Sequence, residues 1–331
     1  MSEQPQQPFP AVLSALFGDD DIPIHLIYRL SDMDDEMFGQ FQRAWADVDE
    51  ERRTAIVRHM AEIAEENYLV DFTPVFAYLF NDEYAAVRHG ALDGVWDSID
   101  PRLIRPIIGL LQKDRNIAVR AAAARSLAHY VLLAEWGQIA TNLATPIVDA
   151  LLEVYERPTT NMEIKRAALE ALAATNHPRV VELIRDAYED GPMDMQLSAI
   201  FAMGVSADDR WLSIINDELE SPSADFRAEA ARAAGSIGNP DAIDGLERLL
   251  NDDDIEVVAA AIYGLGQIGG ERAAELLTRM AADPAYEDFY DIIDEALEEI
   301  DWVTSELDLL AFSEDEDEDD DFAIDIDPSA N

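Results

Sequence analysis

The 331-residue sequence contains no cysteine, which excludes disulfide bridges, thiolate metal sites and cysteine nucleophiles. Its N-terminal sequence, MSEQPQQPFPAVLSALF, has no basic region and only a short apolar run, so it does not resemble a signal peptide. No uninterrupted apolar run reaches the length that a membrane-spanning helix requires. These absences predict a soluble, cytoplasmic protein.

Basic residues are scarce. The chain has 23 lysines and arginines against 70 aspartates and glutamates, a formal net charge of −47. A field of this sign repels nucleic-acid phosphates and anionic lipid headgroups, so we expect neither nucleic acid nor membrane as a partner. The same field favours cationic partners.

One pattern recurs along the chain. Seven nine-residue segments have an apolar first residue and alanine at the fifth, and their starts are 32, 45, 31, 31, 31 and 35 residues apart. The apolar spacing marks one face of a helix. A second amphipathic stretch precedes each segment, which predicts a chain of helix pairs. The segments begin at Val87, Val119, Ile164, Met195, Phe226, Val257 and Ile292.

Turn signals divide the pairs. Asp100-Pro101 and Asn239-Pro240 place a capping side chain before a proline at a helix start. The glycines of GSIGNP and GQIGGE are typical of helix C-termini with a positive φ angle. The one 45-residue step predicts an insertion over about residues 135–158, which we interpret as an extended first helix.

The segments resemble HEAT-like repeats, specifically the short subtype named after phycobilisome lyases. The resemblance rests on Asp82 with Val87-Arg88, on Asp114 with Val119-Arg120, and on Phe226-Arg227 followed by Gly235-Ser236-Ile237-Gly238. It implies an all-α solenoid, a right-handed superhelix of about eight helix pairs over residues 51–312. It also implies a hydrogen-bonded ladder between repeats, to which we assign Asp82, Arg88, Asp114, Arg120 and Arg227.

The resemblance brings two enzyme classes into consideration. HEAT-repeat deoxyhypusine hydroxylases carry His-Glu dipeptides that bind iron, and none of the five histidines here is followed by glutamate. Bilin lyases offer no compact motif to match, and pigment or cofactor handling remains the alternative function. His59 and His89 lie on neighbouring second helices, and we interpret them as surface residues. We expect no catalytic residue, metal or cofactor.

The second helices predict a partner surface. Their first, fifth, eighth and ninth positions face the core, so the third and seventh point outward, onto the concave wall of the solenoid. Leu197, Phe201 and Tyr263 are apolar there, with Ala228 and Ala259 between them. Arg125, Arg166 and Arg232, together with Arg120, Lys165 and Arg227, suggest a basic stripe.

We therefore predict a non-enzymatic scaffold that binds a protein or peptide, with a cationic partner favoured. Two alternatives stay open at these positions. The aromatic side chains are covered by neighbouring structure, or the arginines pair with Glu170, Glu229 and turn aspartates. A third functional alternative is an acidic assembly or chaperone-like factor for a basic client.

The two ends depart from the repeat. Residues 1–50 predict two or three helices that cap the solenoid, although Phe38, Phe41 and Trp45 alternatively form a docking surface. A helix from Asp301-Trp302 to about Leu310 is expected to close the other end. Residues 313–331 hold ten acidic and no basic residues, which predicts a disordered tail. This tail is a solubilising brush, or its FAIDIDP segment (322–328) binds the basic stripe or the patch of Phe201 and Tyr263.

Overall fold

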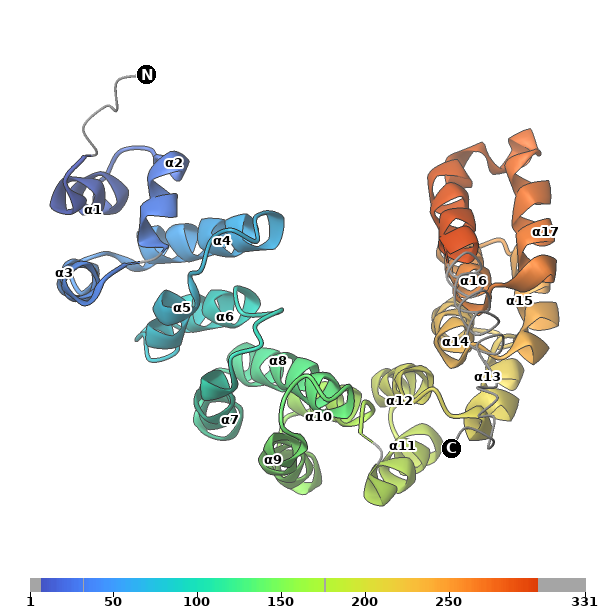
Figure 1. The fold of residues 1–331 in the computed structure, drawn as a ribbon. Helices are drawn as coiled ribbons and strands as arrows, with labels where there is room; N and C mark the ends of the chain where they lie inside the picture. Colours follow the sequence, from blue (N-terminus) through green and yellow to red (C-terminus); the bar gives the residue numbers. More distant parts are fainter. Residues whose placement is uncertain (1–6, 32, 176, 303–331) are drawn as a thin grey trace, which may run out of the picture. The chain divides into compact units, whose positions relative to one another are not determined.

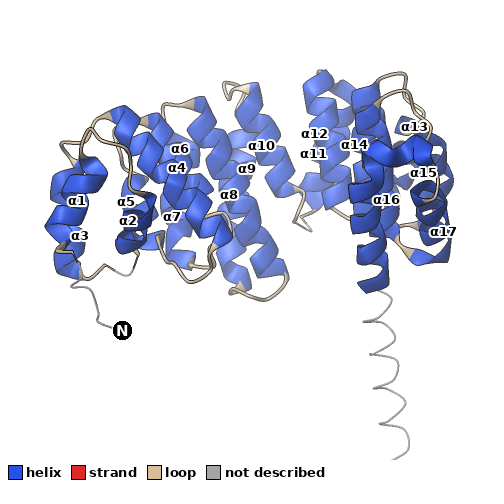
Figure 2. Cartoon of the chain, turned by 90° about the horizontal axis from the view of Figure 1, so that it is seen from above, coloured by secondary structure: helices blue, strands red, loops and turns tan. Residues whose placement is uncertain are grey.

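The computed structural model describes residues 7–31, 33–175 and 177–302, which form helices joined by turns, with no strand in these ranges (Figure 1). Two compact units divide the chain, Met1–Ala199 and Ile200–Asn331. Each unit is a run of helix pairs, and the fold is an all-α solenoid as predicted. The helical character of both units is evident in Figure 2.

The first unit begins with four helices and continues as pairs. The second helices α4, α6, α8 and α10 pack in sequence against one another, and the first helices α7 and α9 form a second layer. The bounds are α1 (Phe9–Phe17), α2 (Ile24–Ile27), α3 (Asp35–Trp45), α4 (Glu50–Glu66), α5 (Thr73–Leu79), α6 (Ala85–Asp93), α7 (Ile104–Lys113), α8 (Ile117–Glu135), α9 (Ala144–Glu156), α10 (Met162–Leu172) and α11 (Pro178–Asp190).

The second unit repeats the same arrangement. It starts inside α12 (Met193–Val205), which crosses the division. Its second helices α14 and α16 lie side by side, each packed against the first helix of its own pair. The bounds are α13 (Leu212–Glu218), α14 (Ala224–Ile237), α15 (Ile243–Leu249), α16 (Ile255–Ile268) and α17 (Gly270–Ala281), and residues 290–302 are helical.

The predicted helix ends are confirmed at atomic level. The Asp100 carboxylate accepts a hydrogen bond from the N–H of Arg102, and the Asn239 side chain accepts one from Asp241. Each cap opens a short 3₁₀ turn that leads into the following α-helix. Gly238 and Gly269 have φ angles of 73° and 68°, the left-handed region in which a Cβ is strained.

The insertion lies elsewhere than expected. We predicted an extended first helix, but α9 has 13 residues, as α11 does, and the second helix α8 has 19. The sequence SLAHYVLLAE contains neither glycine nor proline, so α8 continues to Glu135. Gly137, with a φ angle of 70°, then turns the chain.

Helix α8 is long and largely apolar, although Arg120 and Arg125 interrupt its apolar run. By length and composition it is long and apolar enough to cross a membrane. It packs against α6, α7 and α10, and Leu127, Tyr130 and Val131 are completely buried. Its apolar surface therefore forms the core of the first unit.

The N-terminal aromatic residues are packed inward. Phe41 and Trp45 are buried and stack on each other, and the ring of Phe17 meets both edge-on. Phe38 packs on Phe41 and on Tyr78 of α5. The docking-surface alternative is therefore wrong for Phe41 and Trp45. The predicted tail, 313–331, and the closing helix beyond Trp302 lie outside the described residues.

A charged ladder joins consecutive repeats through the second helices. Arg88 of α6 donates to both oxygens of Asp114 at 2.7 and 2.8 Å, and Arg227 of α14 donates to Asp252 at 2.8 Å. Each aspartate stands two residues before the N-cap of the next second helix, and each arginine stands four residues after the N-cap of its own.

The same two positions relative to the N-caps hold a further arginine–aspartate pair, or rung of the ladder, that we did not predict. Arg88 of the same repeat donates only to the backbone carbonyl of Asp82, at 2.8 Å. The Asp82 carboxylate instead binds Arg53 of α4, at 3.0 Å. Asp82 also accepts hydrogen bonds from the indole N–H of Trp45, at 2.7 Å, and from the N–H of Tyr84. Both charged side chains are almost fully buried, which makes this ion pair the best shielded of the three.

Arg120 has the ladder position but no aspartate to bind. Its Nε donates to the carbonyl of Leu111, and its buried Nη2 has no partner among the described residues. Burial, and after it the charge of Arg157, lowers the pKa of Arg120. The residue two before the N-cap of α10 is Thr159, where the other rungs have a carboxylate.

We predict that Thr159→Asp stabilises the first unit, because its carboxylate supplies the missing acceptor for Arg120. The expected gain is about 1–2 kcal/mol, as for a hydrogen bond to a charged group. Urea unfolding measures it, and the same substitution in an Arg120→Met background is the control. An equal gain in both backgrounds contradicts the assignment.

The ladder also predicts a dependence on pH. The hydrogen bond from Arg227 lowers the pKa of Asp252 below its usual value. The stabilisation is therefore complete above the unfolded-state pKa of about 3.9 and is lost as the pH falls through the lower folded-state value. Asp252→Asn should cost about 2 kcal/mol at neutral pH. The difference in the free energy of unfolding between this variant and wild type, measured by urea unfolding at several pH values, should vanish in strong acid. A difference that does not change with pH would contradict the prediction.

Candidate partner-binding surface

Three side chains from successive second helices of the second unit face solvent. Phe201 of α12 is 43% exposed and Tyr263 of α16 is 51% exposed, and Arg232 of α14 is exposed as well. Each has the seventh position in its repeat. The helices that carry them are neighbours, so these residues form a row, which we call the second-helix face.

Small residues bring these three helices close together. A Cβ on Gly204 of α12 would lie 2.7 Å from the Cα of Ala233 in α14. A Cβ on Gly235 of α14 would lie at the same distance from the Cα of Gly264 in α16. Ala233 follows Arg232 in the chain and Gly264 follows Tyr263, so the contacts that fix the backbones lie directly beneath the face.

The third position of the repeat is less exposed than predicted. Ala121 and Ala228 are buried, and Ala259 and Leu197 are half-buried. The close approach of neighbouring helices covers a side chain as short as alanine. The expectation that these alanines face a partner is therefore wrong for Ala121 and Ala228.

Arg232 carries its own counter-ions. Its guanidinium lies 3.4 Å from Glu229 of the same helix and 3.7 Å from Glu256 of α16. The Glu256 side chain is 75% exposed, and an exposed pair of this kind contributes little to stability. Between the two aromatic rings the face therefore presents one arginine with two glutamates, and it is not basic.

The remaining predicted residues belong to the first unit. Arg166 of α10 donates to the hydroxyl of Ser198 at 2.8 Å, and that hydroxyl donates to Glu170 at 2.6 Å. Ser198 is 2% exposed, so this network bridges α10 and α12 in the helix interface. Arg125 is exposed, on α8. Ser198 was not among the residues predicted from the sequence, although it is a hydroxyl residue between apolar neighbours.

The proposed basic stripe is largely satisfied within the chain. Arg227 binds Asp252, Arg166 binds Ser198, and the Lys165 ammonium lies 5.6 Å from the centre of the Tyr155 ring. These contacts explain why positive charge occurs on the second helices of an acidic chain. Arg125 makes no ion pair with another described residue, and Arg120 donates only to the carbonyl of Leu111.

The two histidines of neighbouring second helices each bind a carboxylate. His59 Nδ1 lies 2.8 Å from Glu62, and His89 Nδ1 lies 3.0 Å from Asp93. No group of three or more histidine, aspartate and glutamate side chains within the described ranges is arranged to hold a metal ion. The hydrogen bond to Asp93 raises the pKa of His89 against the opposing effects of burial and Arg125.

We predict that Asp93→Asn lowers the pKa of His89, because it removes the anionic acceptor. The stabilisation from this pair is complete below the unfolded-state pKa of about 6.5 and is lost as the pH rises through the raised folded-state value. An NMR titration of the imidazole protons measures the shift. His129, whose pKa burial lowers, is the internal control and should not change. An unchanged His89 titration argues against the hydrogen bond.

Comparisons with known proteins agree with this architecture. Residues 212–298 match the family HEAT repeats, and residues 164–190 match the PBS lyase HEAT-like repeat. The curated protein sequences compared with the chain give no match. The structure of the complex of CpcE and CpcF of phycocyanin lyase from Nostoc sp. PCC7120 is similar, with a TM-score of 0.52 and 16% identity. The match covers 86% of this chain and 98% of that one.

Two further structures show weaker likeness. Importin beta has a TM-score of 0.49 and 14% identity over 88% of this chain and 46% of its own. Human deoxyhypusine hydroxylase has a TM-score of 0.35 and 17% identity over 88% of this chain and 96% of its own. At such identities the likeness to the lyase complex concerns the fold alone.

Proposed function

We propose that this chain, a protein of HEAT repeats including the phycobilisome-lyase-like type, is a non-enzymatic scaffold that binds a protein or peptide on its second-helix face. The observation that carries the proposal is the exposure of Phe201 on α12 and Tyr263 on α16, the first and third of three successive second helices in one unit. Burying two such rings removes apolar area from water, and aromatic side chains lose little conformational entropy when they bind.

The backbone beneath the face supports this role. The contacts of Gly204 with Ala233 and of Gly235 with Gly264 hold the three helices at a fixed close spacing. A surface held in this way is preorganised, so binding does not have to order the helices that carry the rings.

The charge of the face favours a partner with a cationic group. Glu229 and Glu256 flank Arg232, and the whole chain has a net charge of −47. A basic side chain of the partner would bind the glutamates and displace Arg232 toward solvent. Association should therefore be faster at low ionic strength.

We predict that Phe201→Ala with Tyr263→Ala weakens partner binding at least about 30-fold, since aromatic anchors at interface centres contribute more than 2 kcal/mol. Affinity capture with mass spectrometry identifies the partner, and titration of the purified pair measures the dissociation constant. Tyr28→Ala is the matched control, because Tyr28 is also 43% exposed but lies on the N-terminal helices. Equal affinities for the two variants would exclude the second-helix face.

Pigment handling is the second candidate, and the likeness to the phycocyanin lyase complex favours it. Under this proposal the purified chain binds a linear tetrapyrrole, and its absorbance spectrum changes on addition of the pigment. A colourless chain with an unchanged pigment spectrum, together with a stable protein partner, favours the scaffold.

A further inference from the structure

The first unit exposes large apolar side chains along one edge. They follow the C-terminal ends of the successive second helices α4, α6 and α8, which pack in order against one another. The exposed fractions are 84% for Tyr68, 90% for Leu69, 49% for Trp96, 66% for Ile99 and 65% for Trp136. Stacked repeats bring equivalent helix ends to the same side, so these residues share an edge.

The fold does not require apolar residues at this position. In the second unit the corresponding connections after α14 and α16 are short glycine turns, at Gly238-Asn239 and at Gly269-Gly270. No large apolar side chain in these two turns is exposed. The apolar edge is therefore a property of the first unit, and exposed aromatics that the fold does not need are typical of a binding surface.

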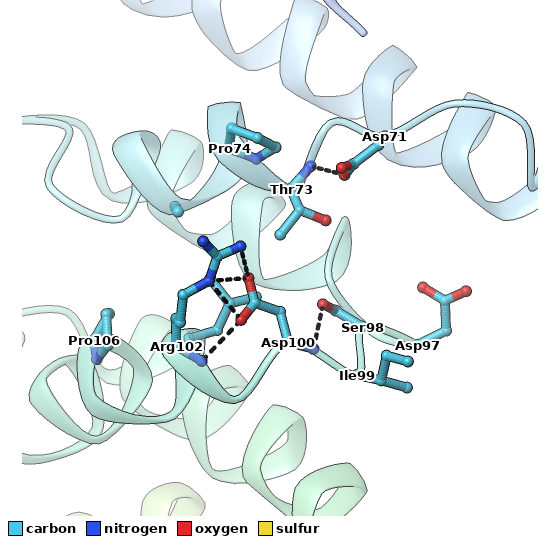
Figure 3. A pocket seen from close by; sticks show the side chains of 11 residues that line it. Asp71, Thr73, Pro74, Asp97, Ser98, Ile99, Asp100, Arg102 and Pro106 are labelled. Carbon is cyan, nitrogen blue, oxygen red and sulfur yellow. Dashed lines mark hydrogen bonds and ion pairs between the residues drawn. The ribbon is translucent and has the colours of Figure 1, made fainter. Parts of the chain in front are cut away.

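A groove of about 660 Å³ opens on this edge, between two successive connections (Figure 3). The α4–α5 connection and the start of α5 form one wall, and the segment from the end of α6 to the start of α7 forms the other. Pro74 and Ala77 lie on the first wall, and Ile99, Leu103 and Pro106 lie on the second. Both walls of the groove thus contribute apolar side chains.

Carboxylates stand at the groove as well. Asp71, Asp97 and Asp100 line it together with one cation, Arg102. Asp100 holds Arg102 through an ion pair of 2.7 Å, and the Asp71 side chain accepts from the N–H of Thr73. In Figure 3 the Asp97 carboxylate points away from these groups, and it makes no ion pair or side-chain hydrogen bond with another described residue.

We propose that this groove binds a peptide segment of a partner in which arginine or lysine alternates with aliphatic residues. The aliphatic side chains pack on Ile99 and the prolines, and the basic side chain binds Asp97. Trp96, which precedes Asp97 in the chain, offers an indole face on which a guanidinium can stack. A carboxylate that forms no ion pair with another described residue, together with the net charge of −47, selects a cation over an anion.

This surface is separate from the second-helix face. Its residues come from the ends of α4 and α6 and the starts of α5 and α7, whereas Phe201, Arg232 and Tyr263 belong to the other unit. The two proposals therefore fail or succeed independently.

The test uses the full chain and a fluorescein-labelled heptapeptide in which leucine and arginine alternate. Fluorescence anisotropy measures its dissociation constant at about 150 mM salt, where long-range attraction is screened. Asp97→Asn with Ile99→Ser should weaken binding at least about tenfold, and Trp96→Ala should weaken it in the same direction. These side chains are exposed, and circular dichroism confirms that the helices are retained.

The matched control is Asp253→Asn with Ile255→Ser. It makes the same charge and polarity changes in the same Asp-x-Ile spacing, and Ile255 is 70% exposed against 66% for Ile99. The affinity of this control variant for the leucine–arginine peptide should stay within about twofold of wild type. A peptide with glutamate in place of each arginine should not bind the wild-type chain.

Three results would overturn the proposal. The first is that the groove variant and the control weaken binding equally, which would indicate general attraction to an acidic chain. The second is that the groove variants retain wild-type affinity. The third is that sedimentation shows a wild-type dimer that Ile99→Ser converts to a monomer, in which case a second copy of the chain occupies the groove.

Discussion

The structure depends on how closely neighbouring second helices approach. Gly204 against Ala233, and Gly235 against Gly264, leave no room for a larger side chain between the backbones. At this spacing the flanking Leu, Ile and Val side chains of both layers close the core, and Ala199, Ala230 and Ala261 are completely buried. A single pair cannot bury its apolar stripe, so stability arises from the interfaces between pairs.

The ladder works at the same interfaces but near the ends of the helices. An arginine in the first turns of one second helix reaches the aspartate before the next, so that each rung links two repeats. At Arg120 the aspartate is missing, and one buried guanidinium nitrogen has no hydrogen-bond partner among the described residues. That loss coincides with the longer α8 and with the connection after it, where the spacing between repeats changes. Between α10 and α12 the hydroxyl of Ser198 accepts a hydrogen bond from Arg166 and donates one to Glu170, and this takes the place of an arginine–aspartate pair.

Two kinds of surface result from this construction. In the second unit the seventh repeat position projects away from the close helix contacts, and two of the side chains there are aromatic and exposed. The connections at the edge of the first unit bury Phe72, Val95 and Leu103, but they also hold tryptophan, tyrosine and isoleucine side chains in solvent. Similarity to solved structures concerns the fold alone, so it does not indicate which of the two surfaces binds a partner.

The periodicity by itself determined the helix pairs, their polar turns and most of the buried positions, because the apolar spacing and the capping residues are local signals. It also placed Phe201 and Tyr263 at an outward position of the repeat, and the tertiary structure decided that they are exposed and not covered by neighbouring structure. The sequence did not determine the partner of Asp82, because Arg53 precedes the clear repeats and the rung joins residues 29 apart. Nor did it determine which helix lengthens near residue 135, since both readings satisfy the same apolar pattern. The burial of Ala121 and Ala228 and the groove beside Asp97 were decided by the tertiary structure alone, because they depend on the distance between backbones that local sequence does not encode.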